Sequence, residues 1–258
     1  SLLSEQIKAN GFKVSISGTS ADEIFTGYYD HFNLHLYEMR NHNSFNSHLK
    51  NWENFIFPNI RNPFLKDPLL YFKDPSTRNH NHLNSEVFSS FLYQNFEIDV
   101  DEEVYTRSLL RNRMLNELLH EATPVILHED DLNSMMYSIE NRSPYLDINL
   151  VEFAQSIPSH HLINKGYSKY ILRDAVKNIL NDKVRLDRKK VGFNASIHSL
   201  INFDDEGSSE YFLSDSPIFD IIKKEKIELL LKKKSLKNSY NKFMFNFLNT
   251  KIFIEKFS

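Results

Sequence analysis

The sequence predicts an α/β protein in which a short parallel-sheet unit is followed by a large helical lobe. Two observations lead to this class. Residues 13–17, Lys-Val-Ser-Ile-Ser, have the β-branched alternation of a strand, and a helical pattern follows them directly. From about residue 103 onward, apolar residues recur at helical spacing. We therefore divide the chain into an α/β unit over 1–40, an irregular insertion over 41–100 and a helical lobe over 101–258.

The composition excludes several classes of protein. The net charge is −3, so nothing favours a nucleic-acid partner. Cysteine is absent, which excludes disulfides, cysteine metal sites and a cysteine nucleophile within this sequence. No apolar run approaches the roughly 20 residues of a membrane span, and no signal peptide is visible. We expect a cytoplasmic protein without membrane contact.

The strand is expected to end in a tight turn that starts a helix. A short helix over 4–10 and a turn at Gly11 precede the strand. Gly18 permits backbone conformations that other residues resist. Ser20 is a suitable N-cap, and Glu23 completes a capping box. One continuous helix is then expected, with an apolar face formed by Ile24, Phe25, Tyr28, Phe32 and Leu36.

This strand–turn–helix unit is suited to binding an anion. In a parallel sheet the Ser17-Gly18 turn lies at the carboxyl end of the strand, where ligands bind. Free N–H groups and the helix dipole favour a phosphate there. Asp22 would then be a ligand of Mg²⁺, which takes one or two carboxylates together with phosphate oxygens. The alternative is an ordinary turn whose acidic residues complement the helix dipole.

The insertion over 41–100 is rich in Pro, Asn, His and aromatic residues. Because Pro disfavours helix at the preceding residue, we expect a series of short elements and turns. Trp52 and Tyr71 are among several aromatic side chains that need a packed environment, so the insertion is expected to be ordered. The tip over 78–82 carries two histidines, but no carboxylate pattern accompanies them, and a polar surface loop is favoured over a metal site.

Successive helices are expected in the lobe. The first has an apolar face formed by Leu110, Met114 and Leu118. Pro124 interrupts the pattern, and a second helix is expected over 130–140. Residues 144–147 turn into a further helix that stops before Pro158.

Three more helices complete the lobe. Ser168 is the expected N-cap of the first, whose core face comprises Ile171, Leu172, Ala175, Val176 and Ile179. The Lys-rich stretch 223–234 has the pattern of a solvated amphipathic helix. Residues 237–257 form an aromatic amphipathic helix that packs against the others.

A basic group lies on the helix after Ser168. Lys169, Arg173 and Lys177 are spaced four residues apart and share one face. Lys169 lies in the first turn, where the helix dipole disfavours a cation, so a nearby phosphate would stabilise it. The alternative is a solvent-facing basic stripe.

A second charged group consists of Glu140, Arg142 and Asp147, which suit an Arg–carboxylate network. Such a network either holds two helices together or shapes a binding pocket, and both interpretations stay open. The remaining titratable groups are interpreted as surface or packing residues rather than metal ligands: His31, His35, His120, His128 and Glu129.

Segments in three parts of the chain carry a resemblance to one family. Residues 17–28 match Ser-Gly-x-Gly-Ala-Asp-Glu-h-Phe-x-Gly-Tyr, where h is apolar. Residues 134–147 match Ser-Met-x-x-Ser-h-Glu-x-Arg-x-Pro-h-Leu-Asp. Residues 169–173 match Lys-x-x-Leu-Arg, and 188–193 match Arg-x-Lys-x-Gly-Phe. In these motifs, and over nearly its whole length, the chain resembles the synthetase domain of glutamine-hydrolysing asparagine synthetase.

The resemblance implies an adenine-nucleotide α-hydrolase-like parallel sheet, of the pyrophosphatase-loop type, with a helical C-terminal lobe. It implies that ATP, with Mg²⁺, adenylates a carboxylate, usually the side chain of aspartate, and that ammonia from glutamine then displaces AMP. By motif position it implies nucleotide contacts at Ser17, Gly18 and Thr19, and a metal ligand at Asp22. It implies catalytic roles for Lys169 and Arg173. It implies a pocket wall formed by Glu140, Arg142 and Asp147.

The sequence departs from the family pattern in three ways. It does not contain the Ser-Gly-Gly-x-Asp-Ser pyrophosphate loop, so we expect it to be the C-terminal part of a synthetase domain that is inactive by itself. It lacks the cysteine of a glutaminase domain, so a glutaminase domain or subunit is an expected partner. Thr19 and Ser20 replace family residues; asparagine-forming relatives have Glu at position 19, and Thr cannot act as a carboxylate base.

These departures allow several interpretations of the function. The acceptor acid is aspartate or a related acid, and the Thr19 form resembles a bacterial subgroup that serves surface-polysaccharide amidation. One alternative is a non-catalytic fragment or split subunit that needs a partner chain with the pyrophosphate loop. Another is an AMP-forming ligase with a different amine as acceptor. A homodimer stays open.

Overall fold

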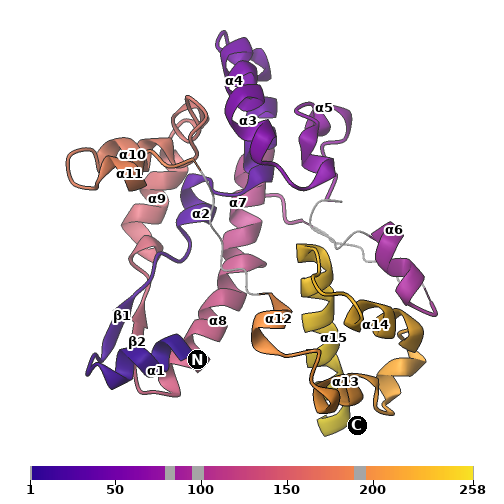
Figure 1. Ribbon diagram of the computed structural model, residues 1–258. Coiled ribbons are helices and arrows are strands. Elements are labelled where there is room, and N and C mark those ends of the chain that lie inside the picture. The colour runs from indigo at the N-terminus through magenta and orange to yellow at the C-terminus, as the bar shows by residue number, and fades with distance from the viewer. Residues whose placement is uncertain (1, 79–84, 95–101, 189–195, 258) are drawn as a thin grey trace. The chain divides into compact units, whose positions relative to one another are not determined.

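The computed structural model describes residues 2–78, 85–94, 102–188 and 196–257 (Figure 1). The chain divides into two compact units, the first made of Ser1–Thr77 and Asp101–Lys189 and the second of Arg78–Val100 and Lys190–Ser258. The described part is an α/β structure, mostly helical with a small parallel sheet, as predicted. None of its helices is long and apolar enough to cross a membrane.

The sheet has two strands, β1 (Val14–Ile16) and β2 (Glu140–Arg142), which pair in parallel with Ser15 opposite Asn141 (Figure 1). The strand β2 corrects the expectation of a helix over 130–140. The helix α8 (Ala122–Met135) ends earlier, because Ser138 takes a left-handed conformation with φ 54°. The amides of Ser138 and Ile139 bond back to Met135 and Ser134, the two bonds of a Schellman helix end.

The first unit begins with α1 (Leu2–Ala9), close to its expected range. The expected continuous helix after β1 is instead two helices, α2 (Ala21–Phe25) and α3 (Tyr29–Glu38). They are separated because Thr26 takes φ 70°. The expected capping box at Ser20 is also wrong, since Ser20 has φ 73° and makes no side-chain cap bond. Its hydroxyl lies 3.1 Å from that of Thr123.

The helix α7 (Leu109–Leu119) carries the core face that periodicity predicts. Leu110, Met114 and Leu118 are all buried, and the helix packs against α2 and α3. Pro124 does not interrupt the next helix, because it occupies the third position of α8, where its missing N–H has no intrahelical partner to lose.

Three helices follow β2 in the first unit: α9 (Ile148–Ser156), α10 (Tyr170–Ala175) and α11 (Asp182–Arg185). The helix α9 stops before Pro158, as predicted. The expected cap at Ser168 is wrong by one residue, since Lys169 is the N-cap of α10. The predicted core face is confirmed for Ile171 and Leu172, which pack against the buried core. It does not extend to Ile179, because α10 ends at Ala175 and Ile179 is 83% exposed.

The part of the insertion that belongs to the first unit is a series of short elements, as predicted. They include α4 (Phe45–Asn51), a π-helical turn over Trp52–Ile56 and α5 (Leu70–Lys73). Trp52 and Tyr71 are buried, so the segment is packed. The 3₁₀ turns of the unit are Met39–Asn41, Phe57–Asn59, Pro63–Lys66, Pro144–Leu146 and Ser159–His161. Residues 79–82 of the proposed polar tip lie outside the described residues.

The second unit has its own aromatic core. Its helices are α6 (Ser85–Phe88), α12 (Ile197–Leu200), α13 (Glu206–Leu213), α14 (Lys224–Leu231) and α15 (Asn238–Phe257), with 3₁₀ turns over Ser89–Phe91 and Pro217–Asp220. Phe88 stacks on Phe243 of α15, with ring centroids 4.7 Å apart. The predicted amphipathic helix is confirmed, since Ile227 and Leu230 of α14 are buried while Lys232 pairs with Glu228 at the surface.

The position of α7 in the core gives a stability prediction. Met114→Ala should lower the free energy of unfolding by about 2–5 kcal/mol, because it leaves a cavity among fully buried side chains. Leu119→Ala on the same helix is the control, since Leu119 is 49% exposed and its loss should cost about 0.5 kcal/mol or less. Chemical denaturation measures both, and equal losses would contradict the assigned core.

Candidate functional site

Hydroxyl side chains gather where β1 and β2 end. The amide of Ser17 donates to the carbonyl of Arg142 at 2.8 Å, which extends the strand pairing by one residue. The Ser17 hydroxyl donates to Thr19 Oγ1 at 3.0 Å and lies 3.1 Å from Ser143 Oγ. The sheet therefore brings predicted nucleotide contacts beside a residue of the second motif.

Asp130 adds a carboxylate to this hydroxyl group. Its Oδ2 accepts from Thr19 Oγ1 at 3.5 Å and from the Asn141 side-chain amide at 3.4 Å. Sequence reasoning missed Asp130, because it lies on α8, 111 residues from Thr19, and only the tertiary structure brings the two together. Its place before the Ser134 motif is the signal that could have found it.

Lys169 and Asp22 form an ion pair between the start of α10 and the first turn of α2. The Lys169 and Asp22 side chains are 27% and 26% exposed, so solvent reaches both. The amide of Lys169 also donates to Thr26 Oγ1 at 3.3 Å. The structure thus joins the predicted catalytic cation and the predicted metal ligand, which are far apart in sequence.

The backbone around this ion pair is strained. Six non-glycine residues in the described part of the chain have positive φ angles, and Ser20, Thr26 and Lys169 are three of them. Such conformations cost a non-glycine residue on the order of 1–3 kcal/mol and cluster at functional sites. The strain therefore supports a functional interpretation of the Asp22–Lys169 region.

Gly27 allows Asp22 to take its position. A Cβ atom on Gly27 would lie 1.8 Å from Asp22 Oδ1, so any side chain there would displace the carboxylate. The Asp22 carboxylate consequently lies directly against the Gly27 backbone.

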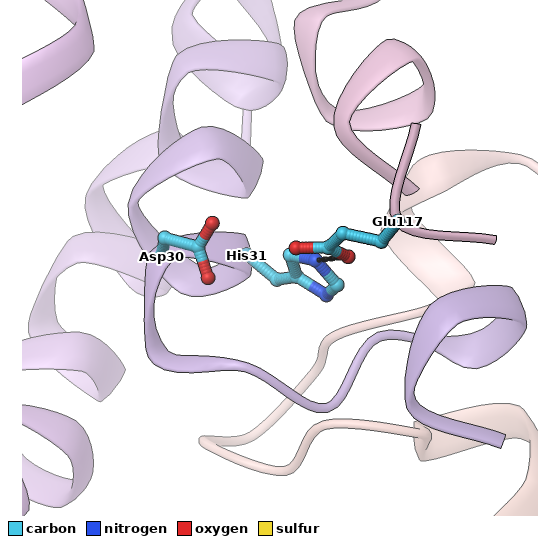
Figure 2. Close-up of side chains that lie close together, drawn as sticks. All are labelled: Asp30, His31 and Glu117. Atoms are coloured by element: carbon cyan, nitrogen blue, oxygen red, sulfur yellow. Dashed lines mark hydrogen bonds and ion pairs between the residues drawn. The ribbon is translucent and has the colours of Figure 1, made fainter. Parts of the chain in front are cut away.

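A buried polar network lies next to the same turn and includes Asp30, His31 and Glu117, whose side chains lie close together in Figure 2. The amide of Gly27 donates to His31 Nδ1 at 3.2 Å, and His31 Nε2 lies 2.7 Å from Glu117 Oε2. The hydroxyl of Tyr28 donates to Glu23, and burial together with that carboxylate raises the pKa of Tyr28. His31, interpreted from sequence as a surface or packing residue, is fully buried on α3, where it contacts Glu117 of α7.

Arg113 balances part of the negative charge in this network. It contacts Asp30 at 3.4 Å and Glu102 at 2.6 Å. Burial alone would lower the pKa of Arg113, but these carboxylates raise it by more. Burial raises the pKa of Glu117, which His31 counteracts.

Arg173 supports the turn that carries Lys169. Its Nε donates to the carbonyl of Ser168 at 2.9 Å, and its guanidinium also donates to the carbonyl of Arg185. Burial lowers the pKa of Arg173. Lys177 lies beyond the end of α10 and is exposed, so the predicted continuous basic stripe is not formed.

The third predicted group lies at the surface. Glu140 and Arg142 pair at 2.8 Å with side chains 60% and 62% exposed. Asp147 is the N-cap of α9 and accepts from the amides of Asn149 and Leu150. Their role as a pocket wall stays a prediction. Of residues 188–193, only Arg188 is described, and it lies over the ring of Tyr167 at 3.8 Å.

The residues around Asp22 are compatible with Mg²⁺. Asp22 offers one partly exposed carboxylate, and Mg²⁺ is bound by one or two carboxylates plus phosphate oxygens. Among the described residues, the one group of three acidic or histidine side chains with ligand atoms within 4.8 Å is Asp30, His31 and Glu117, which is buried and separate from Asp22.

The close approach of Gly27 gives a second prediction. Gly27→Ala should lower the free energy of unfolding by about 1–3 kcal/mol, because the new methyl group must displace the Asp22 carboxylate. Gly207→Ala is the matched control, since its Cβ would have 3.5 Å to its nearest neighbour and no loss is expected. Thermal denaturation compares the two variants, and a Gly27→Ala protein as stable as the parent would refute the contact.

Known proteins resemble this chain in sequence. Over 68 residues it is 40% identical to asparagine synthetase (glutamine-hydrolyzing) 1 of Bacillus subtilis (strain 168). That match covers 26% of this chain and 11% of the length of the relative. No solved structure matches the chain. A family model described as asparagine synthase matches residues 1–254, and by this coverage the chain belongs to the asparagine synthase family.

Proposed function

We propose that the protein is an ATP-dependent amide synthetase. It adenylates the carboxylate of aspartate or a related acid and transfers glutamine-derived ammonia to it, giving an amide, AMP and pyrophosphate. Family membership supports the reaction class, and the name of the relative supports a ligase that hydrolyses glutamine. The observation that carries the proposal is the contact of Lys169 with Asp22, which brings together two of the family motifs.

The residues of the site have distinct roles in this proposal. Lys169 would place its ammonium group on the reacting phosphates, where it stabilises negative charge that develops in the transition state. Ser17, Gly18 and Thr19 would contact the nucleotide from the strand end. Asp22 would hold Mg²⁺, which neutralises phosphate charge when bound. Arg173 would keep the Ser168 carbonyl, and with it the Lys169 turn, in place.

The finer structural and cellular assignments are part of the same proposal. The parallel pairing of β1 and β2, with ligand residues at the strand ends, is compatible with an adenine-nucleotide α-hydrolase-like sheet. A glutaminase domain or subunit would supply ammonia, and the cytoplasm would supply ATP. Asp130 lies beside Thr19 and offers the carboxylate that Thr19 lacks.

The third prediction tests this function with Lys169→Ala. In the complete gene product, pyrophosphate release from ATP, Mg²⁺, aspartate and glutamine should fall by about 10²–10³-fold, because a charge aimed at the reacting phosphates is lost. Lys177→Ala should keep parental turnover, since Lys177 is exposed outside α10. Melting curves check that both variants fold. Parental turnover in Lys169→Ala would rule out the proposed role.

A further inference from the structure

We infer that His31 and Glu117 are positioning residues for the Asp22–Lys169 site. They would act through the Thr26–Gly27 turn, because His31 accepts the amide of Gly27 and contacts Glu117. The identity of the site as a nucleotide site rests on the proposed function, whereas the link between the buried pair and the turn does not.

The hydrogen bonds define one protonation state of the pair. The Gly27 amide donates to His31 Nδ1, so Nδ1 carries a lone pair and no proton. The proton of the neutral imidazole then lies on Nε2, which donates to the Glu117 carboxylate at 2.7 Å. A backbone N–H, an imidazole and a carboxylate thus form one chain of hydrogen bonds in a fully buried position.

Charged groups lie near His31 both on its own helix and on the helix that packs against it. Asp30 lies next to it on α3, and Glu117 and Arg113 lie on α7, whereas Glu23 on α2 accepts from Tyr28. Tyr28 packs edge-on against the imidazole, with ring centroids 5.3 Å apart. Arg113 also contacts Glu102. Because acidic groups outnumber the single arginine, a proton gained by His31 would be stabilised, but it would remove the acceptor of the Gly27 amide.

The same three side chains, Asp30, His31 and Glu117, have the composition of a metal site. The hydrogen bonds favour the positioning role instead. A metal on Nε2 would require the imidazole proton on Nδ1, where the Gly27 N–H already points. Asp30 also contacts the Arg113 guanidinium.

The Thr26–Gly27 turn connects the His31–Glu117 pair with the Asp22–Lys169 ion pair. Asp22 lies against the Gly27 backbone, so a shift of Gly27 moves the surface that supports the carboxylate. Thr26 Oγ1 accepts from the Lys169 amide, so the same turn also anchors the other member of the ion pair. Loss of the Glu117 acceptor should therefore loosen the contact between Asp22 and Lys169.

The test measures how fast an amine-specific reagent labels Lys169, read by mass spectrometry on the 258-residue chain without ligand. Glu117→Leu removes the acceptor and should raise the labelling rate about threefold, as expected for loss of a partly exposed ion pair. Asp22→Asn sets the rate for complete loss of the pair. Glu117→Gln keeps an acceptor oxygen and should restore the parental rate.

His35→Gln is the matched control. His35 is also a buried histidine on α3, one turn after His31, but it contacts His48 rather than the Gly27 turn. This variant should lose stability while Lys169 keeps its parental labelling rate. Parental labelling in Glu117→Leu, or faster labelling in His35→Gln, would overturn the inference.

Two further measurements separate the positioning role from the alternatives. In nitrogen-15 NMR, the Gly27 amide and the His31 ring should titrate with one midpoint, which should shift to lower pH in Glu117→Leu because that carboxylate raises the pKa of His31. Independent titrations would contradict the link. Stoichiometric Zn²⁺ uptake that Glu117→Leu abolishes would replace it with a metal site.

A nucleotide-binding experiment relates the His31–Glu117 pair to the proposed function. Binding of Mg²⁺–ATP to the complete gene product should weaken about threefold in Glu117→Leu, with no change in His35→Gln. If the parent binds no nucleotide, the proposed function fails while the labelling result still decides the positioning role. If the parent binds and both variants match it, the positioning role fails while the proposed function stands.

Discussion

The turn at Thr26 and Gly27 is the constraint on which the candidate site depends. It separates α2 from α3, so that the chain changes direction directly after the acidic first turn of α2. Asp22 lies against Gly27 on one side, and His31 receives the Gly27 amide on the other. A continuous helix would place these groups at fixed helical offsets and would not allow either contact.

Strand pairing brings together the hydroxyl residues of the candidate site. The parallel register of β1 and β2 places Ser17 next to Arg142 and Ser143, which belong to a motif more than a hundred residues later. Asn141 of β2 also bonds to Asp130 of α8, whose carboxylate accepts from Thr19. Because parallel strands need a long crossover connection, these neighbours are necessarily distant in sequence.

The sequence predicts those features that depend on local pattern. The buried face of α7, with Leu110 and Met114, follows from helical periodicity alone. The strand β2, the left-handed Ser20 and the partner of Thr19 do not, because each depends on contacts with distant residues. Local preference favoured a capping box at Ser20, and tertiary contact with the start of α8 overrode it.

The Asp22–Lys169 pair and the His31–Glu117 pair differ in how readily they can change partners. Asp22 and Lys169 are each about a quarter exposed, and a pair with that much solvent contact contributes about 1 kcal/mol or less. His31 and Glu117 are buried, where leaving one partner unpaired costs about 1–3 kcal/mol or more. The exposed pair can therefore exchange partners more readily than the buried pair, which bonds to the Gly27 turn.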